Sequence, residues 1–162
     1  MAGLVLTDAS PLIGLVRVDG LPWLQSLFGT VCMPPQVHAE VITSHGFDGE
    51  ASIVSAIDAG WLQVSSVPPT MPDLPDLDEG EAACIRLALA SSAQALLLMD
   101  ERAGRAVAQE HGLRVAGTAA VIGMAKKNGL IVCAKDVFAR LHGSDFRISA
   151  QVISTVLRRV GE

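Results

Sequence analysis

The chain has 162 residues, the size of one domain with a substantial hydrophobic core. Half of the residues (50%) are hydrophobic, 18% are charged, and the formal net charge is −5. The negative charge argues against a general electrostatic attraction to nucleic acid, but it leaves room for a local basic patch beside an acidic, metal-binding site. The usual charged fraction is about 25%, so a chain this poor in charge is expected to bury surface against a partner as well as in its own core. We predict a single domain over residues 1–162.

Cysteine spacing and N-terminal composition indicate the compartment. Cys32, Cys84 and Cys133 are far apart and form no C-x-x-C pair, which argues against a zinc site or a disulfide framework. The N-terminus lacks the features of a signal peptide, and no apolar run is long enough to span a bilayer. We therefore expect a cytoplasmic protein with reduced thiols and no membrane-spanning segment.

The first half of the chain predicts short strands in alternation with helices. The expected strands are apolar runs at Leu4–Thr7, Val31–Met33 and Trp61–Val67. The expected helices are Pro11–Val16, Leu21–Phe28, Pro35–Thr43 and Ala51–Ala59. Ser10 is the expected N-cap of the first helix, since Ser followed by Pro is a typical helix start. His45–Gly49 is expected to be a loop.

The second half continues the same alternation. Pro68–Asp78 holds four of the eight prolines and is expected to be an irregular connection within one domain. Two further strands are expected at Leu96–Met99 and Leu113–Ala116. Five helices are expected at Glu79–Ser91, Arg102–His111, Thr118–Lys127, Ala134–Leu141 and Ser149–Val160. This order predicts a three-layer α/β/α fold with a parallel sheet of about five strands.

Two of the expected strands end on a carboxylate. Asp8 follows the strand Leu4–Thr7, and Asp100 follows the strand Leu96–Met99. In open parallel sheets, ligands bind in the crevice beyond the carboxyl ends of the strands. The two carboxylates are therefore expected on one rim of the sheet.

Two more acids are candidates for the same rim. Glu40 lies on a helix that follows a strand, and Glu81 starts the helix that leads into the strand of Asp100. A cluster of oxygen donors without His or Cys suits a hard cation such as Mg²⁺ or Mn²⁺. Such a cation would also relieve the mutual repulsion of the carboxylates.

Each acid also has a purely structural interpretation. Asp78 and Glu81 spell a D-x-x-E capping box, so Glu81 could serve only to cap its helix. Asp100 could be the N-cap of the helix that begins near Arg102, and Glu40 could be a solvated helix residue. These alternatives remain open from the sequence.

Four polar residues near the same rim could assist. Arg102 and Arg105 lie one turn apart and could hold phosphate, although a solvated basic face is the alternative. Ser10 and Thr118 could supply supporting hydroxyls, or could have only local turn roles. The absence of G-x-G-x-x-G, a Walker lysine and G-x-S-x-G disfavours other α/β chemistries.

Several segments together resemble a known family. They are LVLTDAS (residues 4–10), MPPQVHAEV (33–41), LDEGEAACIRLALA (77–90), LLMDERAGRAVAQEHGLRVAGT (97–118) and the tail 143–162. In order and spacing they are similar to PIN-domain proteins, in the branch of VapC-like toxins of toxin–antitoxin systems. The resemblance runs over nearly the whole chain.

The resemblance implies an Mg²⁺- or Mn²⁺-dependent endoribonuclease acting on single-stranded or structured RNA. Four positions match the family's acids: Asp8, Glu40, Glu81 and Asp100. Many members have Asp at the third position, so Asp78 or Glu79 could substitute for Glu81. The resemblance also implies a homodimer, with contacts among helices between residues 11 and 59, and a small antitoxin that covers the site.

Two functions without cleavage compete with this interpretation. One is a non-catalytic PIN-like binding module, and the other is a phosphate- or nucleotide-binding α/β regulator without a metal. The complete set of acids favours the enzyme.

Overall fold

The computed structural model describes residues 3–43 and 46–162. Within these ranges, five strands alternate with nine helices. The strands are β1 (Leu4–Thr7), β2 (Val31–Met33), β3 (Leu62–Val64), β4 (Ala95–Leu98) and β5 (Arg114–Ala116). The helices are α1 (Ala9–Val16), α2 (Leu21–Phe28), α3 (Pro35–Val41), α4 (Glu50–Asp58), α5 (Glu79–Ala90), α6 (Arg102–Glu110), α7 (Thr118–Lys127), α8 (Ala134–His142) and α9 (Ala150–Arg159).

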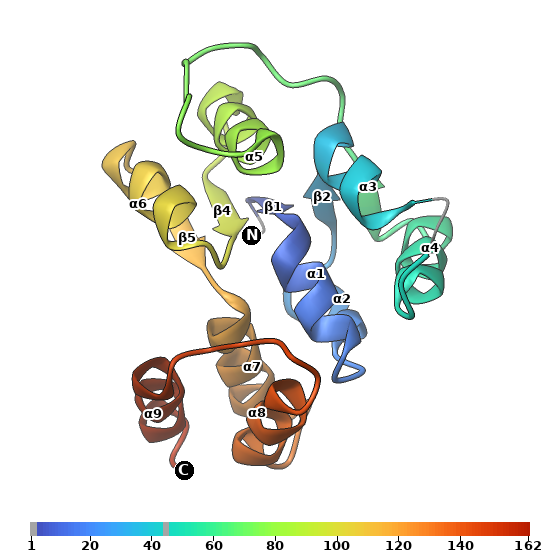
Figure 1. Ribbon diagram of the computed structural model, residues 1–162, viewed down its shortest axis with the longest axis vertical. Coiled ribbons are helices and arrows are strands. Elements are labelled where there is room, and N and C mark those ends of the chain that lie inside the picture. Colours follow the sequence, from blue (N-terminus) through green and yellow to red (C-terminus); the bar gives the residue numbers. More distant parts are fainter. Residues whose placement is uncertain (1–2, 44–45) are drawn as a thin grey trace.

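The strands form one parallel sheet in the order β3-β2-β1-β4-β5. Helices α1, α2 and α4 lie on one side of the row of strands, and α5 and α6 lie on the other (Figure 1). This arrangement confirms the predicted three-layer α/β/α fold. The short apolar strands are buried because helices cover both faces of the sheet.

The sheet has its topological switch point between β1 and β4. The two strands are in register at Thr7 and Leu98, and the backbone N–H of Asp8 donates to the carbonyl of Leu98 over 2.9 Å. The chain leaves β1 into α1 and leaves β4 into α6, which lie on opposite faces. A crevice for a ligand is expected at such a point, beyond the carboxyl ends of the strands.

Two hydrophobic clusters hold the layers together. The larger one surrounds the sheet and includes the fully buried Leu6, Leu12 and Leu97. The smaller one joins α7, α8 and α9 and includes the buried Ile122 and Phe138. Helix α7 also packs on α1 and α2, so the last three helices extend one face of the molecule (Figure 1).

The start of α1 corrects one prediction. Ser10 is not the N-cap; the helix begins at Ala9, and Asp8 occupies the N-cap position in an extended conformation (φ −79°, ψ 174°). Asp8 is therefore the only residue between the end of β1 at Thr7 and the start of the helix. Pro11 still lies in the first turn, where its missing N–H has no intrahelical acceptor.

Several predicted ends also shift. Strand β3 stops at Val64, short of the predicted Trp61–Val67, because it pairs only with the three-residue strand β2. Helix α3 ends at Val41 rather than Thr43, since Ile42 is extended. The predicted loop His45–Gly49 begins outside the described residues at His45.

Two broader expectations concern thiols and membranes. The three cysteines are free thiols, and Cys84 is buried. Across residues 3–43 and 46–162, every helix is too short or too polar to cross a membrane.

Candidate functional site

Asp8 is a buried carboxylic acid at the carboxyl end of β1. It is only 4% exposed, and its side chain makes no capping hydrogen bond to α1. Burial raises the pKa of Asp8 to about 7, although the N–H of Ala9 opposes this shift. The negative charges that raise the pKa further belong to three nearby carboxylates, Asp78, Glu81 and Glu40. We call Asp8, Glu40, Asp78 and Glu81 the acidic cluster.

The start of α5 contains the predicted capping box. The backbone N–H of Glu81 donates to Oδ1 of Asp78 over 2.8 Å, and the N–H of Asp78 donates to Oε1 of Glu81 over 3.2 Å. The side chain of Glu81 is 5% exposed, and burial raises its pKa. Its second oxygen, Oε2, is buried without a hydrogen-bond partner among the described residues. The cap therefore satisfies only half of the Glu81 carboxylate.

Two glycines allow helices to approach these carboxylates closely. A Cβ atom at Gly80 would lie 3.0 Å from Oδ1 of Asp8. A Cβ atom at Gly104 would lie 2.5 Å from Oε2 of Glu81 and 2.7 Å from Sδ of Met99. The unpartnered oxygen of Glu81 thus lies directly beneath the first turns of α6.

Glu40 is an exposed member of the acidic cluster. It lies on α3, which packs against both α1 and α5. Burial of its carboxyl group and the charge of Asp78 raise the pKa of Glu40. Although the residue is solvated, its carboxylate therefore lies within the field of the cluster.

Asp100 has a different environment from the acidic cluster. Its Oδ1 accepts the backbone N–H of Thr118 and its Oδ2 accepts the Thr118 hydroxyl, each over 2.7 Å. Burial raises the pKa of Asp100, while these two hydrogen bonds and the charge of Arg105 lower it. The alternative that Asp100 caps the following helix is wrong, because Glu101 is the N-cap of α6. Asp100 instead holds the first residue of α7.

The predicted basic and hydroxyl residues lie on the Asp100 side of the rim. Arg105 donates from Nη1 to the carbonyl of Met99 over 3.0 Å, whereas Arg102 is exposed. Together with Ser10 and Asp100, these arginines line a groove of about 1050 Å³ whose opposite wall includes α9. We call it the α9 groove.

The acidic cluster fits a divalent cation by the chemistry of its donors. Within residues 3–43 and 46–162, no three His, Cys, Asp or Glu side chains are close enough together, as positioned, to share an ion. The donors are nevertheless all carboxylate oxygens, Asp8 has a pKa of about 7, and Oε2 of Glu81 is buried without a partner. Each of these features indicates missing positive charge, which a hard cation would supply.

Sequence reasoning gives too little weight to two acids. It treats Asp78 as part of a capping box and as a substitute for Glu81, yet the charge of Asp78 also raises the pKa of both Asp8 and Glu40. It misses Glu101, whose charge raises the pKa of Glu81. The signal for Glu101 is its position directly after Asp100, where the chain turns into α6.

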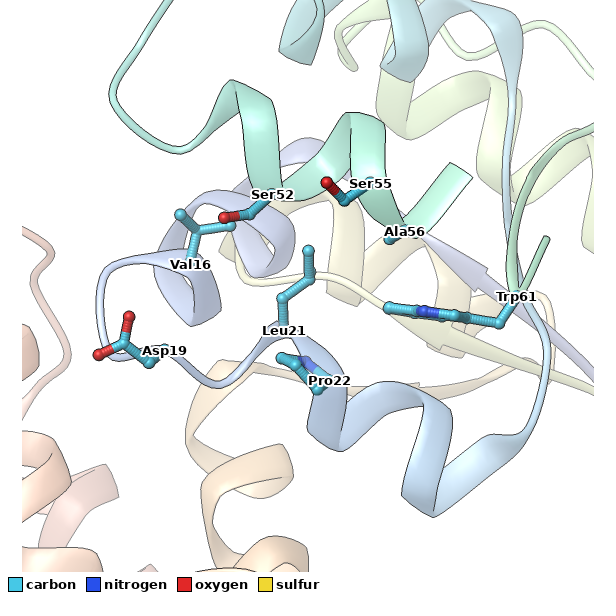
Figure 2. A pocket seen from close by; sticks show the side chains of 8 residues that line it. All are labelled: Val16, Asp19, Leu21, Pro22, Ser52, Ser55, Ala56 and Trp61. Atoms are coloured by element: carbon cyan, nitrogen blue, oxygen red, sulfur yellow. The ribbon is translucent and has the colours of Figure 1, made fainter. Parts of the chain in front are cut away.

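A second, smaller pocket lies apart from these acids. It has a volume of about 260 Å³ and lies between the end of α1, the start of α2 and α4. Figure 2 shows Trp61 beside Ala56 and Leu21 pointing toward α4, the helix that carries Ser52, Ser55 and Ala56. It contains none of the predicted site residues.

The fold and the crevice define a three-layer α/β protein with an acidic site at the switch point of its sheet. The chain belongs to the PIN-domain family, whose model matches residues 4–162. The members of this family are generally nucleases.

Comparison with solved structures supports the fold. The chain is similar to a PilT N-terminus domain protein from the hyperthermophilic archaeon Sulfolobus solfataricus, with a TM-score of 0.56 and 19% sequence identity. The similarity covers 73% of this chain and 89% of the archaeal one. No curated protein matches the sequence.

Proposed function

We propose that the protein is a metal-dependent endoribonuclease and the toxin of a toxin–antitoxin pair in the cytoplasm. Family membership supports nuclease chemistry. The observation that carries the proposal is the acidic cluster at the switch point, where Asp8 has a pKa of about 7 and Oε2 of Glu81 is buried without a hydrogen-bond partner in the described chain. Such carboxylates are poorly explained by stability alone, since each adds an unfavourable charge to a buried site.

In this proposal Asp8, Glu40, Glu81 and Asp100 hold Mg²⁺ or Mn²⁺, and Asp78 adds negative charge beside them. A bound cation would lower the pKa of a water molecule and neutralise charge on an RNA phosphodiester. Arg105 stabilises negative charge on the scissile phosphate.

The two hydroxyl residues have supporting roles in the same proposal. Thr118 fixes the orientation of the Asp100 carboxylate through its N–H and hydroxyl. Ser10, on the first turn of α1, faces the groove in which the substrate lies.

Cleavage and metal binding should be measured together. We expect the parent protein to cut RNA only with Mg²⁺ or Mn²⁺, and Mn²⁺ to raise its melting temperature. Asp8→Asn should lose both effects, whereas Asp76→Asn, an exposed acid outside the cluster, should retain both. A parent that cuts RNA equally well in EDTA would contradict the proposal.

A non-catalytic binding module is the second candidate function. It is favoured by the structural use of the acids, since Glu81 caps α5 and Thr118 occupies both oxygens of Asp100. A module of this kind would show no Mn²⁺-dependent rise in melting temperature and no cleavage. The metal titration therefore separates the two functions.

We also propose that the protein forms a homodimer and binds a small antitoxin that covers the site. The apolar composition supports burial against a partner, and Val54 on α4 is a large hydrophobic residue that is 39% exposed. In this proposal, helices within residues 11–59 form the dimer contact. Light scattering should give the mass of a dimer at micromolar concentration, and a monomer without antitoxin would contradict this assignment.

A further inference from the structure

The α9 groove brings together residues from distant parts of the sequence. One side is formed by Asp100 and the first turns of α6, and the other by residues 145–149 and α9. Its volume, about 1050 Å³, slightly exceeds the roughly 300–1,000 Å³ typical of small-molecule pockets.

Arginine is enriched in this groove although the chain is acidic overall. Four of the 12 lysines and arginines line it: Arg102, Arg105, Arg147 and Arg159. None of the four forms an ion pair within the described chain, where the ion pairs are Lys126–Glu162 and Arg140–Asp19. Three acids, Asp100, Glu101 and Asp145, also line the groove, so the formal charge of its lining exceeds neutrality by only one positive charge.

The wall that carries Arg147 is anchored to the rest of the domain. The ring of Phe146 packs against Gly14 of α1, where a Cβ atom would lie 2.8 Å from the ring. Arg17 donates a hydrogen bond to the carbonyl of Ser144, and the side chain of Ser149 caps α9 by accepting the N–H of Val152 over 3.2 Å. Packing and hydrogen bonds therefore hold the segment that carries Arg147 in place.

The lining of the groove also includes apolar side chains. Ala119, Ala120, Ile148 and Val152 belong to its lining, and Val152 is 44% exposed. Single-stranded nucleic acid requires both kinds of surface, because its phosphates bind cations and its unpaired bases pack on apolar or aromatic groups. A duplex keeps its bases stacked inside and would leave the apolar lining unused.

We propose that the α9 groove binds the backbone of single-stranded nucleic acid, with Arg147 and Arg159 holding phosphates on the side formed by residues 145–149 and α9. This inference rests on the proposed nuclease function, because it assigns the path by which a strand reaches the acidic rim. The arginines of α6 bind the strand near the rim, and those of the C-terminal segment bind it farther away. The C-terminal segment thereby becomes part of the substrate-binding surface.

The test is binding of a labelled oligouridylate in EDTA, which separates affinity from cleavage. The variant Arg147→Gln/Arg159→Gln is compared with Arg114→Gln/Arg158→Gln, which removes the same charge. Arg158 neighbours Arg159 on α9, and neither Arg114 nor Arg158 lines the groove. We expect the groove variant to bind roughly tenfold more weakly at low salt, and its logarithmic salt slope to fall by about 0.7 for each phosphate that the variant no longer binds. The control should resemble the parent.

The outcomes distinguish this inference from the proposed function. A groove variant with the affinity and salt slope of its control, or a parent that binds duplex RNA as tightly as single strands, would overturn the inference. If those variants behave as the parent while the parent cleaves RNA with Mn²⁺, the nuclease function stands without the groove. If binding depends on the groove but the parent does not cleave, the groove stands and the catalytic proposal fails.

Discussion

The acidic cluster and the carboxylate of Glu162 have opposite environments. Glu162 accepts the backbone N–H groups of Ala134 over 2.7 Å and Lys135 over 3.0 Å at the start of α8. These donors lower the pKa of Glu162 to about 2, whereas burial with few donors raises the pKa of Asp8 to about 7. A carboxylate that accepts several hydrogen bonds stabilises the fold. A buried carboxylate with few hydrogen-bond donors around it indicates a role that requires a positively charged partner.

Asp100 lies between these two extremes. It is buried, as Asp8 is, but Thr118 supplies two donors, as the start of α8 does for Glu162. The proposed metal site therefore combines acids that lack partners with one that is already held in place. Replacing each carboxylate by its amide separates the two roles.

The largest effect is expected for Asp8→Asn. The raised pKa means that the folded state holds the proton more tightly, so ionisation of Asp8 destabilises the parent as pH rises from about 4 to about 7. Asn cannot ionise, so the variant should be more stable than the parent at pH 8, by up to about 4 kcal/mol at about 1.4 kcal/mol for each pKa unit. The two proteins should be similar at pH 4, while cleavage is lost. Urea unfolding at both pH values measures the difference, and a less stable variant at pH 8 would contradict it.

The next largest effect on stability is expected for Asp100→Asn, with the opposite sign. The change replaces a charged acceptor of two Thr118 hydrogen bonds, each of which contributes about 1.5–3 kcal/mol. Asn retains one acceptor oxygen, so one of the two bonds is lost, and removal of a buried charge whose pKa is raised offsets part of that loss. We therefore expect a loss of less than about 3 kcal/mol, together with lost cleavage. Thr118→Val removes the hydroxyl, so the double variant should lose less stability than the sum of the single variants. Additive losses would argue against this contact.

Glu81 distinguishes a cap from a metal ligand. Glu81→Ala removes the side chain that accepts the N–H of Asp78 and should lower stability by about 0.5–2 kcal/mol. Glu81→Gln retains an acceptor, so its stability without metal should be close to that of the parent, while Mn²⁺ affinity and cleavage fall. Calorimetric titration with Mn²⁺ distinguishes the two roles. Equal Mn²⁺ affinities of Glu81→Gln and the parent would show that Glu81 is a helix cap and not a metal ligand.

The smallest effect is expected for Glu162→Gln, at the opposite end of the comparison. The lowered pKa of Glu162 means that its contribution to stability is fully present above pH 4.5 and disappears as pH falls toward about 2. The variant should therefore melt at a slightly lower temperature than the parent at pH 7, with little difference near pH 2. Glu110→Gln, at an exposed position on α6, is the matched control. Equal melting temperatures of Glu162→Gln and the control at pH 7 would show that the contact adds nothing.

Local sequence patterns determined the strands, most helices and the capping box. The apolar runs 4–7 and 96–99 predict strands buried on both faces, each followed by an acid, Asp8 or Asp100, and the second strand is observed one residue earlier, at Ala95–Leu98. The D-x-x-E pattern of Asp78 and Glu81 specifies the start of α5. These features depend on residues within a few positions of one another, which is why the sequence alone predicts them.

Tertiary packing decided the environment of each acid. Asp100 bonds to Thr118, which is 18 positions away, because β5 returns the chain to the same rim. The free oxygen of Glu81 lies beneath Gly104 because α6 packs on α5. By itself, the sequence determined which carboxylates are present and where strands deliver them. Only the tertiary structure decided which of them find donors, since donors and burial come from elements that are distant along the chain.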